Sequence, residues 1–276
     1  MSIASEITRL EGAKSSLKNK LNSLNDAQHQ ITDETIDEYV DFLDTILDDY
    51  KTCDAIADEI LMSSIDIPNT PILQLVGSLN NGNTYDSNIS YWENLINNTN
   101  ISISNSSWDN KTLVFNGNNT EFNSGVAQSS LSNGYTIALR IKPDKWDSNN
   151  GIIGLHYANN TGICGIQCYQ NNITYQHYNN GAIRLALSDI PVNTWNTIII
   201  TYNSSNNLVK FINNGSLKGS VTAVLKPNSN VIIGRAGNTT DSFRYFKGNM
   251  SHLIIYDRLL NDNEIENLNN YIQNTV

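Results

Sequence analysis

The chain has 276 residues, of which 39% are hydrophobic and only 16% are charged, so it can bury a sizeable core beneath a polar, weakly charged surface. Of the formal charge of -10, residues 1–65 carry -9 (14 acidic and 5 basic residues) and the remaining residues carry -1 (13 and 12). Because Lys and Arg are not clustered, we expect no nucleic-acid binding, and because no run of 18 apolar residues exists, we expect no membrane insertion.

The first 65 residues predict helices with a narrow apolar seam. The seam residues recur at alternating spacings of four and three, as in a coiled coil, with Lys14 interrupting the series. Such a seam is too narrow to be stable alone, so we expect this region to pair with copies of itself, as a trimer, or with another protein. The predicted oligomerisation seam consists of Ile3, Ile7, Leu10, Leu17, Leu21, Leu24, Ile36, Val40, Leu43 and Leu47.

Two stretches of this region carry a resemblance. Residues 9–18 (RLEGAKSSLK) and 36–46 (IDEYVDFLDTI), separated by a loop, resemble a short helical N-terminal module of bacteriophage and prophage structural proteins. In those proteins the module precedes a variable distal domain. The resemblance implies that residues 1–65 anchor or oligomerise an exposed component of a virion.

From Ile67 onward the helical periodicity ends and short apolar alternations appear between turns rich in Asn and Gly. In residues 135–142 every second side chain is apolar, and Asn213-Asn214-Gly215 predicts a tight hairpin turn. Many short strands that never alternate with helices indicate two packed antiparallel sheets. Residues 66–107 are interpreted as a linker with the first strands, and residues 108–276 as a jelly roll with a short C-terminal helix. The predicted class for the whole chain is α+β.

Several blocks of the β region occur in the order typical of one family, and together they resemble the concanavalin A-like, laminin-G-like jelly rolls. One departure is that Asn196 and Thr197 follow Trp195, where many relatives carry His. The resemblance implies the fold but not one function, because lectins, adhesion modules, glycosidases and inert structural domains share it. The blocks are residues 108–117, 135–143, 195–203, 210–215, 233–235 and 246–260, followed by Glu264, Ile265 and Leu268.

No catalytic residues are predicted. Asp262, Glu264 and Glu266 are spaced two apart, but on a helix such side chains diverge, and Asn261 with Glu264 predicts a helix-capping box instead. No cofactor or metal is predicted either. The oxygen-rich loops at 147–151 and 238–241 leave calcium open, although neither has the spaced ligands of a convincing site.

Carbohydrate binding is the remaining specific hypothesis. If Cys164, Ile166, Cys168, Ile173, Tyr175, Ile183, Leu185 and Leu187 face the core, the alternate residues of the same strands project together from the opposite face. Aromatic rings with amides and a guanidinium suit a neutral glycan. The alternative is that these side chains only decorate a solvated sheet. The candidate binding residues are Gln167, Tyr169, Gln176, Tyr178 and Arg184.

The four tryptophans divide into two groups. Trp92, Trp108 and Trp195 are assigned to the core, whereas Trp146 is expected at the periphery.

Taken together, these observations predict a bacteriophage virion structural protein, a head or tail fibre or appendage subunit. It would be exposed on the particle, associate with itself and other virion proteins, and bind host-surface carbohydrate. The alternatives are a capsid-decorating protein without a ligand and, less favoured by the residues, an enzyme that degrades polysaccharide.

Overall fold

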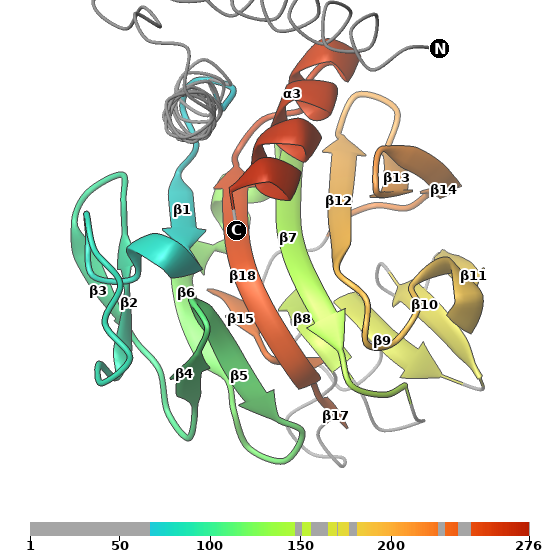
Figure 1. The fold of residues 1–276 in the computed structure, drawn as a ribbon. Coiled ribbons are helices and arrows are strands. Elements are labelled where there is room, and N and C mark those ends of the chain that lie inside the picture. Colours follow the sequence, from blue (N-terminus) through green and yellow to red (C-terminus); the bar gives the residue numbers. More distant parts are fainter. Residues whose placement is uncertain are drawn as a thin grey trace, which may run out of the picture. The chain divides into compact units, whose positions relative to one another are not determined.

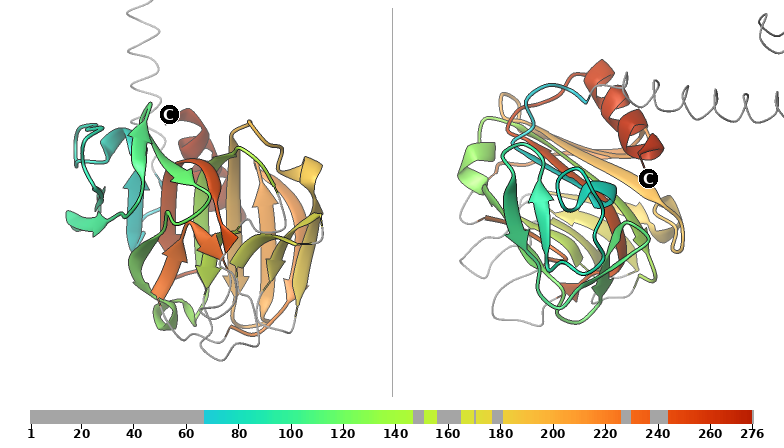
Figure 2. Two further views of the ribbon diagram at one scale, coloured as in Figure 1. Left: turned by 90° about the horizontal axis from the view of Figure 1, so that it is seen from below. Right: turned by 60° about the vertical axis from the view of Figure 1, so that its left-hand side comes forward.

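The computed structural model describes residues 67–146, 151–155, 165–169, 171–176, 181–225, 230–236 and 244–275. Two antiparallel sheets are stacked face to face, and one helix lies across the outer face of the larger sheet (Figures 1 and 2). Strands that are far apart in sequence are neighbours in both sheets, as in a jelly roll. The described residues include no helix long and apolar enough to cross a membrane.

The larger sheet has eight strands. Its order is β14 (Ser216–Thr222), β13 (Leu208–Asn213), β12 (Asn196–Asn203), β7 (Tyr135–Pro143), β18 (Lys247–Tyr256), β5 (Thr112–Asn116) and β4 (Ser107–Asp109), and β1 (Leu73–Val76) also pairs with β18.

The smaller sheet has six strands. Its order is β11 (Ala182–Ala186), β10 (Asn172–Gln176), β9 (Gly165–Tyr169), β8 (Gly151–Leu155), β15 (Asn230–Ile233) and β6 (Phe122–Ala127). Among the residues that the structure describes, two short pairs complete the strands, β2 (Tyr91–Asn94) with β3 (Thr99–Ser102) and β16 (Arg235–Ala236) with β17 (Arg244–Tyr245). The helix in the described ranges is α3 (Asp262–Asn274), and the short 3-10 turns there are η1 (Gly77–Leu79), η2 (Gln128–Leu131) and η4 (Leu187–Asp189).

The main core fills the space between the two sheets. The alternation predicted for residues 135–142 is confirmed, because Tyr135, Ile137, Leu139 and Ile141 on β7 all belong to this core, whereas Ala138 belongs to a second cluster. The predicted turn between β13 and β14 is also present. Asn214 (φ 48°) and Gly215 (φ 76°) both adopt the left-handed conformation that Asn and Gly tolerate.

The second cluster lies between the larger sheet and α3. On β12, Ile198 and Ile200 face the main core while Ile199 faces the helix, so this strand is buried on both faces. The helix contributes Ile265, Leu268 and Ile272 to the same cluster.

Both ends of α3 are held by specific polar contacts. At the N-terminus, the side chain of Asn261 accepts a hydrogen bond from the backbone N–H of Glu264 (3.0 Å), and the Glu264 carboxylate accepts one from the backbone N–H of Asn261 (2.8 Å). The predicted capping box is therefore confirmed. At the C-terminal end, Nη1 of Arg140 donates to the carbonyl of Ile272 (2.7 Å). The capping box holds the first turn of the helix, and the Arg140 contact links its last turn to β7 of the sheet.

The predicted α+β class is wrong. Almost all regular structure in the described residues is β-strand, with the 13-residue α3 as the single α-helix among them. The physical reason is that apolar side chains after Ile67 alternate or run continuously on strands, and only the capped C-terminal segment spaces them for a helix. The N-terminal helices and their seam (Ile3, Ile7, Leu10, Leu17, Leu21, Leu24, Ile36, Val40, Leu43 and Leu47) lie outside the described residues.

Three of the four tryptophans lie where the sequence places them. Trp92 and Trp108 are buried in the core, and Trp146 is half-buried at its margin, where its Nε1 donates to the carbonyl of Ile190 (2.7 Å). The core assignment of Trp195 is wrong. This side chain is half-buried, and Cζ of Arg140 lies 5.6 Å from its indole centroid. Trp195 comes one residue before β12, whose buried residues begin at Asn196.

Candidate functional site

The candidate face is the side of the six-stranded sheet that points away from the core. On β9, β10 and β11 the expected alternation is observed, because Ile166, Cys168, Ile173, Tyr175, Ile183 and Leu185 are all buried against the core. Leu187 is half-buried, and Cys164 lies outside the described residues. The intervening residues of these strands therefore belong to the outer face.

Three of these outer residues form one row across the strands. In the antiparallel register Thr174 on β10 stands directly opposite Gln167 on β9 and opposite Arg184 on β11. Directly opposed residues lie on the same side of a sheet with Cβ atoms about 4.5–5.5 Å apart. The fold thus brings Gln167 and Arg184 together on one face, with the hydroxyl of Thr174 between them.

The members of this row differ in exposure. Arg184 is exposed, but Gln167 is only 1% exposed and Thr174 only 3%. Gln167 also has an interaction partner, whereas the Thr174 hydroxyl is buried without a hydrogen bond. A buried hydroxyl without a hydrogen bond lowers the stability of the fold, because its lost contacts with water are not replaced. As the structure stands, Arg184 is the member of the row that a ligand can reach directly.

The other predicted binding residues are only partly placed. Tyr169 is the last residue of β9 and Gln176 the last residue of β10, and Asn172 pairs with Tyr169 in the register. The side chains of Tyr169 and Gln176, and all of Tyr178, lie outside the described residues. The oxygen-rich loops considered for calcium lie almost wholly outside them too.

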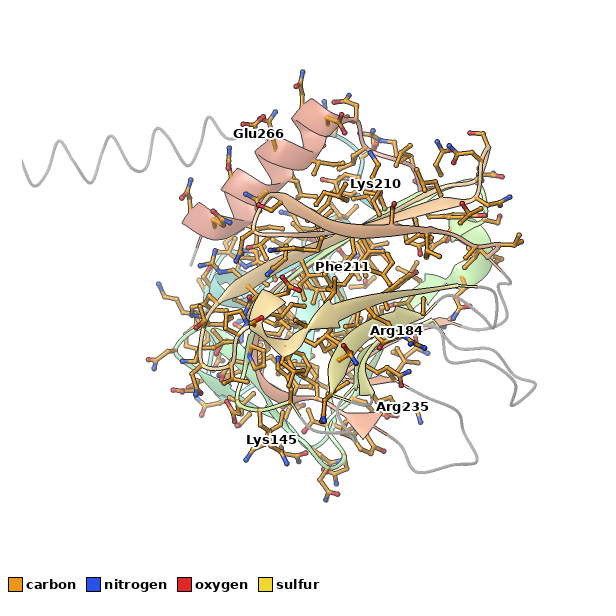
Figure 3. All side chains as sticks on the ribbon, turned by 90° about the vertical axis from the view of Figure 1, so that its right-hand side faces the viewer. Lys145, Arg184, Lys210, Phe211, Arg235 and Glu266 are labelled. Atoms are coloured by element: carbon orange, nitrogen blue, oxygen red, sulfur yellow. The ribbon has the colours of Figure 1, made fainter. Side chains whose placement is uncertain are left out.

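An ion pair lies beside this sheet. Nε of Arg235 on β16 is 2.8 Å from Oε2 of Glu121, next to β6, and both side chains are partly buried. Burial, followed by the nearby carboxylate of Glu121, raises the pKa of Tyr245 on β17. The β16 strand contacts β8 and β9, which places this pair next to the row described above. Figure 3 shows this side of the domain, with Arg184 and Arg235 labelled.

Of the carboxylates considered for catalysis, Glu264 has a structural role, whereas Asp262 and Glu266 lie one helical turn apart on α3. Glu264 belongs to the capping box and pairs with Arg258 (2.7 and 3.0 Å), an interaction that lowers the pKa of the carboxyl group. No group of three or more His, Cys, Asp or Glu residues positioned to hold a metal is found within the described ranges.

His252 is buried in a structural cluster beneath α3. Its two ring nitrogens contact Oγ of Ser251 (2.9 Å) and Oγ1 of Thr275 (3.0 Å). Burial, followed by the positive charge of Arg140, lowers the pKa of His252 to about 3, so the ring is neutral at pH 7. His29, His156 and His177 lie outside the described residues.

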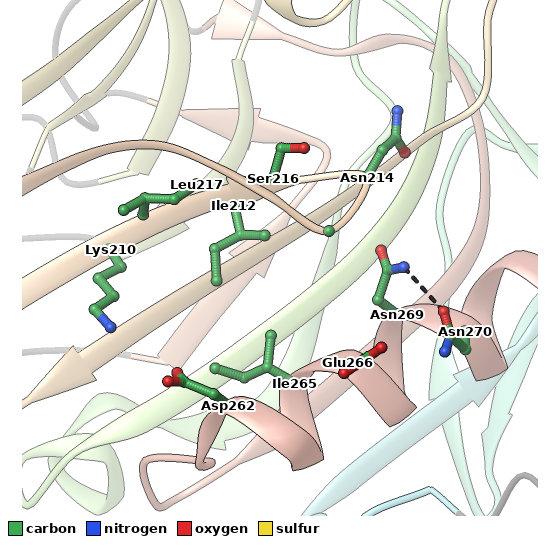
Figure 4. A pocket seen from close by; sticks show the side chains of 11 residues that line it. Lys210, Ile212, Asn214, Ser216, Leu217, Asp262, Ile265, Glu266, Asn269 and Asn270 are labelled. Carbon is green, nitrogen blue, oxygen red and sulfur yellow. Dashed lines mark hydrogen bonds between the residues drawn. The ribbon is translucent and has the colours of Figure 1, made fainter.

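A hollow of about 540 Å³ separates α3 from the β13–β14 hairpin. Ile212 and Ile265 face one another across it in Figure 4, and Asp262, Glu266 and Lys210 stand at its margin. Its lining contains carboxamides, carboxylates and one ammonium group but no aromatic ring. It therefore lacks the stacking platform that sugar recognition favours.

A second hollow, of about 430 Å³, was not found by sequence reasoning. It is lined by Tyr85, Ser87, Trp108, Asp109, Asn110 and Lys111. The sequence gives little indication of this hollow, since it predicts Trp108 as a core residue and Asp109-Asn110 as a turn. The pairing of Tyr85 with Trp108 comes from the tertiary fold (ring centroids 6.4 Å apart, planes at 84°).

Solved structures share this fold at low sequence identity. The binding domain of botulinum neurotoxin DC in complex with SialylT has 17% identity and a TM-score of 0.54, covering 75% of this chain and 53% of that one. A botulinum neurotoxin type C structure, described as dependent on two ganglioside molecules for cell entry, has 18% identity and a TM-score of 0.53, with 75% and 52% covered.

A third similar structure is the sialidase of Trypanosoma rangeli in complex with the inhibitor DANA. It has 16% identity and a TM-score of 0.57, and the match covers 85% of this chain and 39% of the sialidase. The chain thus corresponds to about half of the toxin structures and to about two fifths of the sialidase. At these identities the likeness concerns the fold alone. No curated protein matches the sequence.

One family model matches the sequence itself. Residues 116–266 match the model of the concanavalin A-like lectin/glucanases superfamily, described as laminin G-like, and this region spans 151 of the 276 residues. This region contains β7, β12 and β18 of the larger sheet and every strand of the smaller sheet. On this match, with the jelly-roll topology beside it, the chain belongs to the concanavalin A-like lectin/glucanases superfamily.

Proposed function

We propose that this chain is a structural subunit of a bacteriophage particle, a head or tail fibre or appendage, whose lectin-like β-sandwich binds carbohydrate on the host surface. Residues 1–65 attach the subunit to other virion proteins and bring copies together, as a trimer. The sandwich is displayed outward and carries out no catalysis. The observation that carries the proposal is that a lectin-type fold follows 65 residues that are strongly acidic and have regularly spaced apolar side chains.

The composition supports this division of labour. Residues 1–65 hold nine net negative charges and regularly spaced apolar residues, whereas the family-matched part is nearly neutral and rich in Asn. A neutral amide-rich surface contacts uncharged glycans without the desolvation cost that charged side chains carry. Spaced apolar residues in an acidic segment favour association with another polypeptide.

The similar solved structures support the binding part of the proposal. The botulinum structures are described in terms of SialylT and ganglioside contacts, and the trypanosomal protein is a sialidase. Those ligands belong to those proteins. For this chain they make a glycan the first ligand class to test.

A glycan array tests the binding part. The full chain should bind a subset of neutral glycans, and Tyr169→Ala, Tyr178→Ala and Arg184→Ala should each weaken that binding if the predicted face is the contact surface. Lys218→Ala is the matched control, because it removes a cation from β14, on the other sheet. Binding that is unchanged in all three variants would reject this face, and a failure of the full chain to bind any glycan would favour the ligand-free decoration role.

Electron microscopy of particles from cells that encode this chain tests the virion part. Antibodies against the sandwich should decorate the particle at regular exposed positions, and light scattering of the purified chain should give a mass near three times 30.7 kDa. Unlabelled particles would contradict the virion role. A monomer at micromolar concentration would contradict the trimer and leave attachment to another virion protein as the mode of anchoring. Incubation with capsular polysaccharide should release no reducing ends.

A further inference from the structure

We propose that the hollow lined by Tyr85, Ser87, Trp108, Asp109, Asn110 and Lys111 is a binding site for one neutral sugar residue. The inference rests on the proposed glycan-binding function and gives it a place and a ligand class. The site lies entirely before residue 116, where the family match begins, so it is a feature of this chain's own N-terminal strands. Its volume of about 430 Å³ falls within the range of small-molecule sites.

The aromatic wall of the hollow is held rigidly from behind. Trp108 is 8% exposed, and its Nε1 donates to the carbonyl of Ile89 (3.1 Å). Trp92 packs edge-on against it, with ring centroids 5.1 Å apart, and is itself anchored by a hydrogen bond to the carbonyl of Val76. Because the core fixes these rings before a ligand arrives, binding need not order them.

Tyr85 supplies the accessible ring. It is half-buried and meets Trp108 edge-on, so the two rings form a corner. The loop that carries Tyr85 is clamped by the buried amide of Asn80, which accepts from the backbone N–H of Asp86 and donates to its carbonyl (both 2.8 Å). A fixed aromatic corner is suited to the C–H face of a sugar ring.

The polar wall is the turn between β4 and β5. Asn110 (φ 44°) and Lys111 (φ 63°) occupy the two central positions of this hairpin, where Gly is preferred at the second. A lysine in the left-handed conformation is strained, and strain of this kind is retained where the surrounding structure enforces it.

The turn is enforced from two sides. Oγ1 of Thr112 donates to the carbonyl of Asp109 (2.6 Å) and accepts from the amide of Asn249 (2.9 Å). A Cβ atom added to Gly77 would lie 2.0 Å from the carbonyl oxygen of Lys111, so only glycine allows this close backbone approach. The lysine is therefore held at the margin of the hollow although glycine would fit the turn with less strain.

The charges at the hollow favour an uncharged ligand. Asp109 and Lys111 are exposed and flank one turn, and they contribute one negative and one positive charge. Within the described part of the chain, the side chains of Ser87, Asp109, Asn110 and Lys111 form no hydrogen bond or ion pair, so their donors and acceptors are open to sugar hydroxyls. A carboxylate sugar would meet the Asp109 carboxylate, and a phosphate would find one cation only.

A titration of the ¹⁵N-labelled full chain tests the site. D-Glucose, D-galactose, D-mannose and N-acetylneuraminic acid are added separately, and the indole N–H signal of Trp108 is followed after assignment with Trp108→Phe. At least one neutral hexose should shift that signal in a saturable manner, whereas N-acetylneuraminic acid should not. Tyr85→Ala and Asp109→Asn should each weaken hexose binding at least tenfold. The matched control Asp144→Asn, which neutralises an exposed carboxylate outside the hollow, should leave it unchanged.

Lys111→Gly separates a ligand role from a structural one. The substitution should raise the urea midpoint of unfolding, because it relieves the left-handed lysine, and at the same time weaken hexose binding several-fold. A merely structural lysine would give the first effect without the second, and that result would overturn the role of the ammonium group.

The results of these experiments distinguish a failure of the proposed sugar site from a failure of the proposed glycan-binding function. If the full chain binds neutral glycans on an array and Tyr85→Ala and Asp109→Asn bind equally well, the site is wrong while glycan binding stands. A Trp108 shift with N-acetylneuraminic acid alone would overturn the neutral class. If hexoses shift Trp108 in the proposed manner but no array glycan binds and particles lack the protein, the proposed function fails and the site stands.

Discussion

The two sheets present outer faces of opposite character. On the eight-stranded sheet Ala138, Ile199 and Ile254 are fully buried beneath α3, as part of an apolar layer. On the six-stranded sheet the corresponding face carries exposed Ala182, Arg184 and Ala186 on β11 and exposed Asn123, Gly125 and Ala127 on β6. The helix-covered face thus serves stability, whereas the other face is open along its edge strands β11 and β6, with Gln167 and Thr174 buried between them.

The largest effect should come from shortening an apolar side chain with which α3 packs on the sheet. Leu268 of α3 is 0% exposed, so Leu268→Ala should lower the free energy of unfolding by about 2–5 kcal/mol in urea denaturation. Leu217→Ala is the matched control, because Leu217 is 60% exposed, and it should change stability by less than about 0.5 kcal/mol. Equal losses in the two variants would mean that α3 does not seal this face.

The same layer should make stability depend on pH through His252. Its pKa is about 3 in the folded chain against 6.5 in the unfolded chain, so the unfolded state binds the additional proton as pH falls below 6.5. The free energy of unfolding should therefore be fully retained above pH 6.5 and decline by up to about 1.4 kcal/mol per pH unit toward pH 3. Urea denaturation at several pH values should give a shallower slope between pH 6.5 and 4.5 for His252→Gln. Parallel slopes would contradict a neutral, buried ring.

A smaller effect should come from the start of α3. Asn261→Ala removes the capping acceptor and should cost about 1 kcal/mol by urea denaturation. Asn267→Ala changes an exposed position of the same helix and should be neutral or slightly stabilising. If the two substitutions cost the same, the cap is not what begins the helix.

The smallest effect on stability should come from the open face. Arg184→Ala should alter the free energy of unfolding by less than about 0.5 kcal/mol, because Arg184 is exposed. Its consequence should be seen instead in weaker glycan binding on an array. A large loss of stability would show that this residue supports the sheet.

Much of this architecture follows from local sequence patterns. Alternation on β9, β10 and β11 identifies the buried set from Ile166 to Leu185, and Asn261 with Glu264 identifies the start of α3. Those signals are local because side chains alternate along a strand and caps act within one turn. The order of the blocks in the β region also predicts the family that residues 116–266 match.

What covers a face or meets across the fold does not follow from local patterns. Alternation places Gln167 on the outer face but does not reveal that this side chain is 1% exposed. Likewise, Tyr85 and Trp108 are 23 positions apart, and only the tertiary fold makes them one corner of a hollow. Trp195 looks like a core residue, yet its partner is Arg140 on the neighbouring strand.

The most direct test of the account is the binding of the intact chain to immobilised glycans before and after mild periodate oxidation of their vicinal hydroxyls. We predict saturable binding to neutral glycans that oxidation abolishes and that Tyr85→Ala weakens. Failure to bind any of them, or binding that survives oxidation undiminished, would contradict a carbohydrate-binding sandwich.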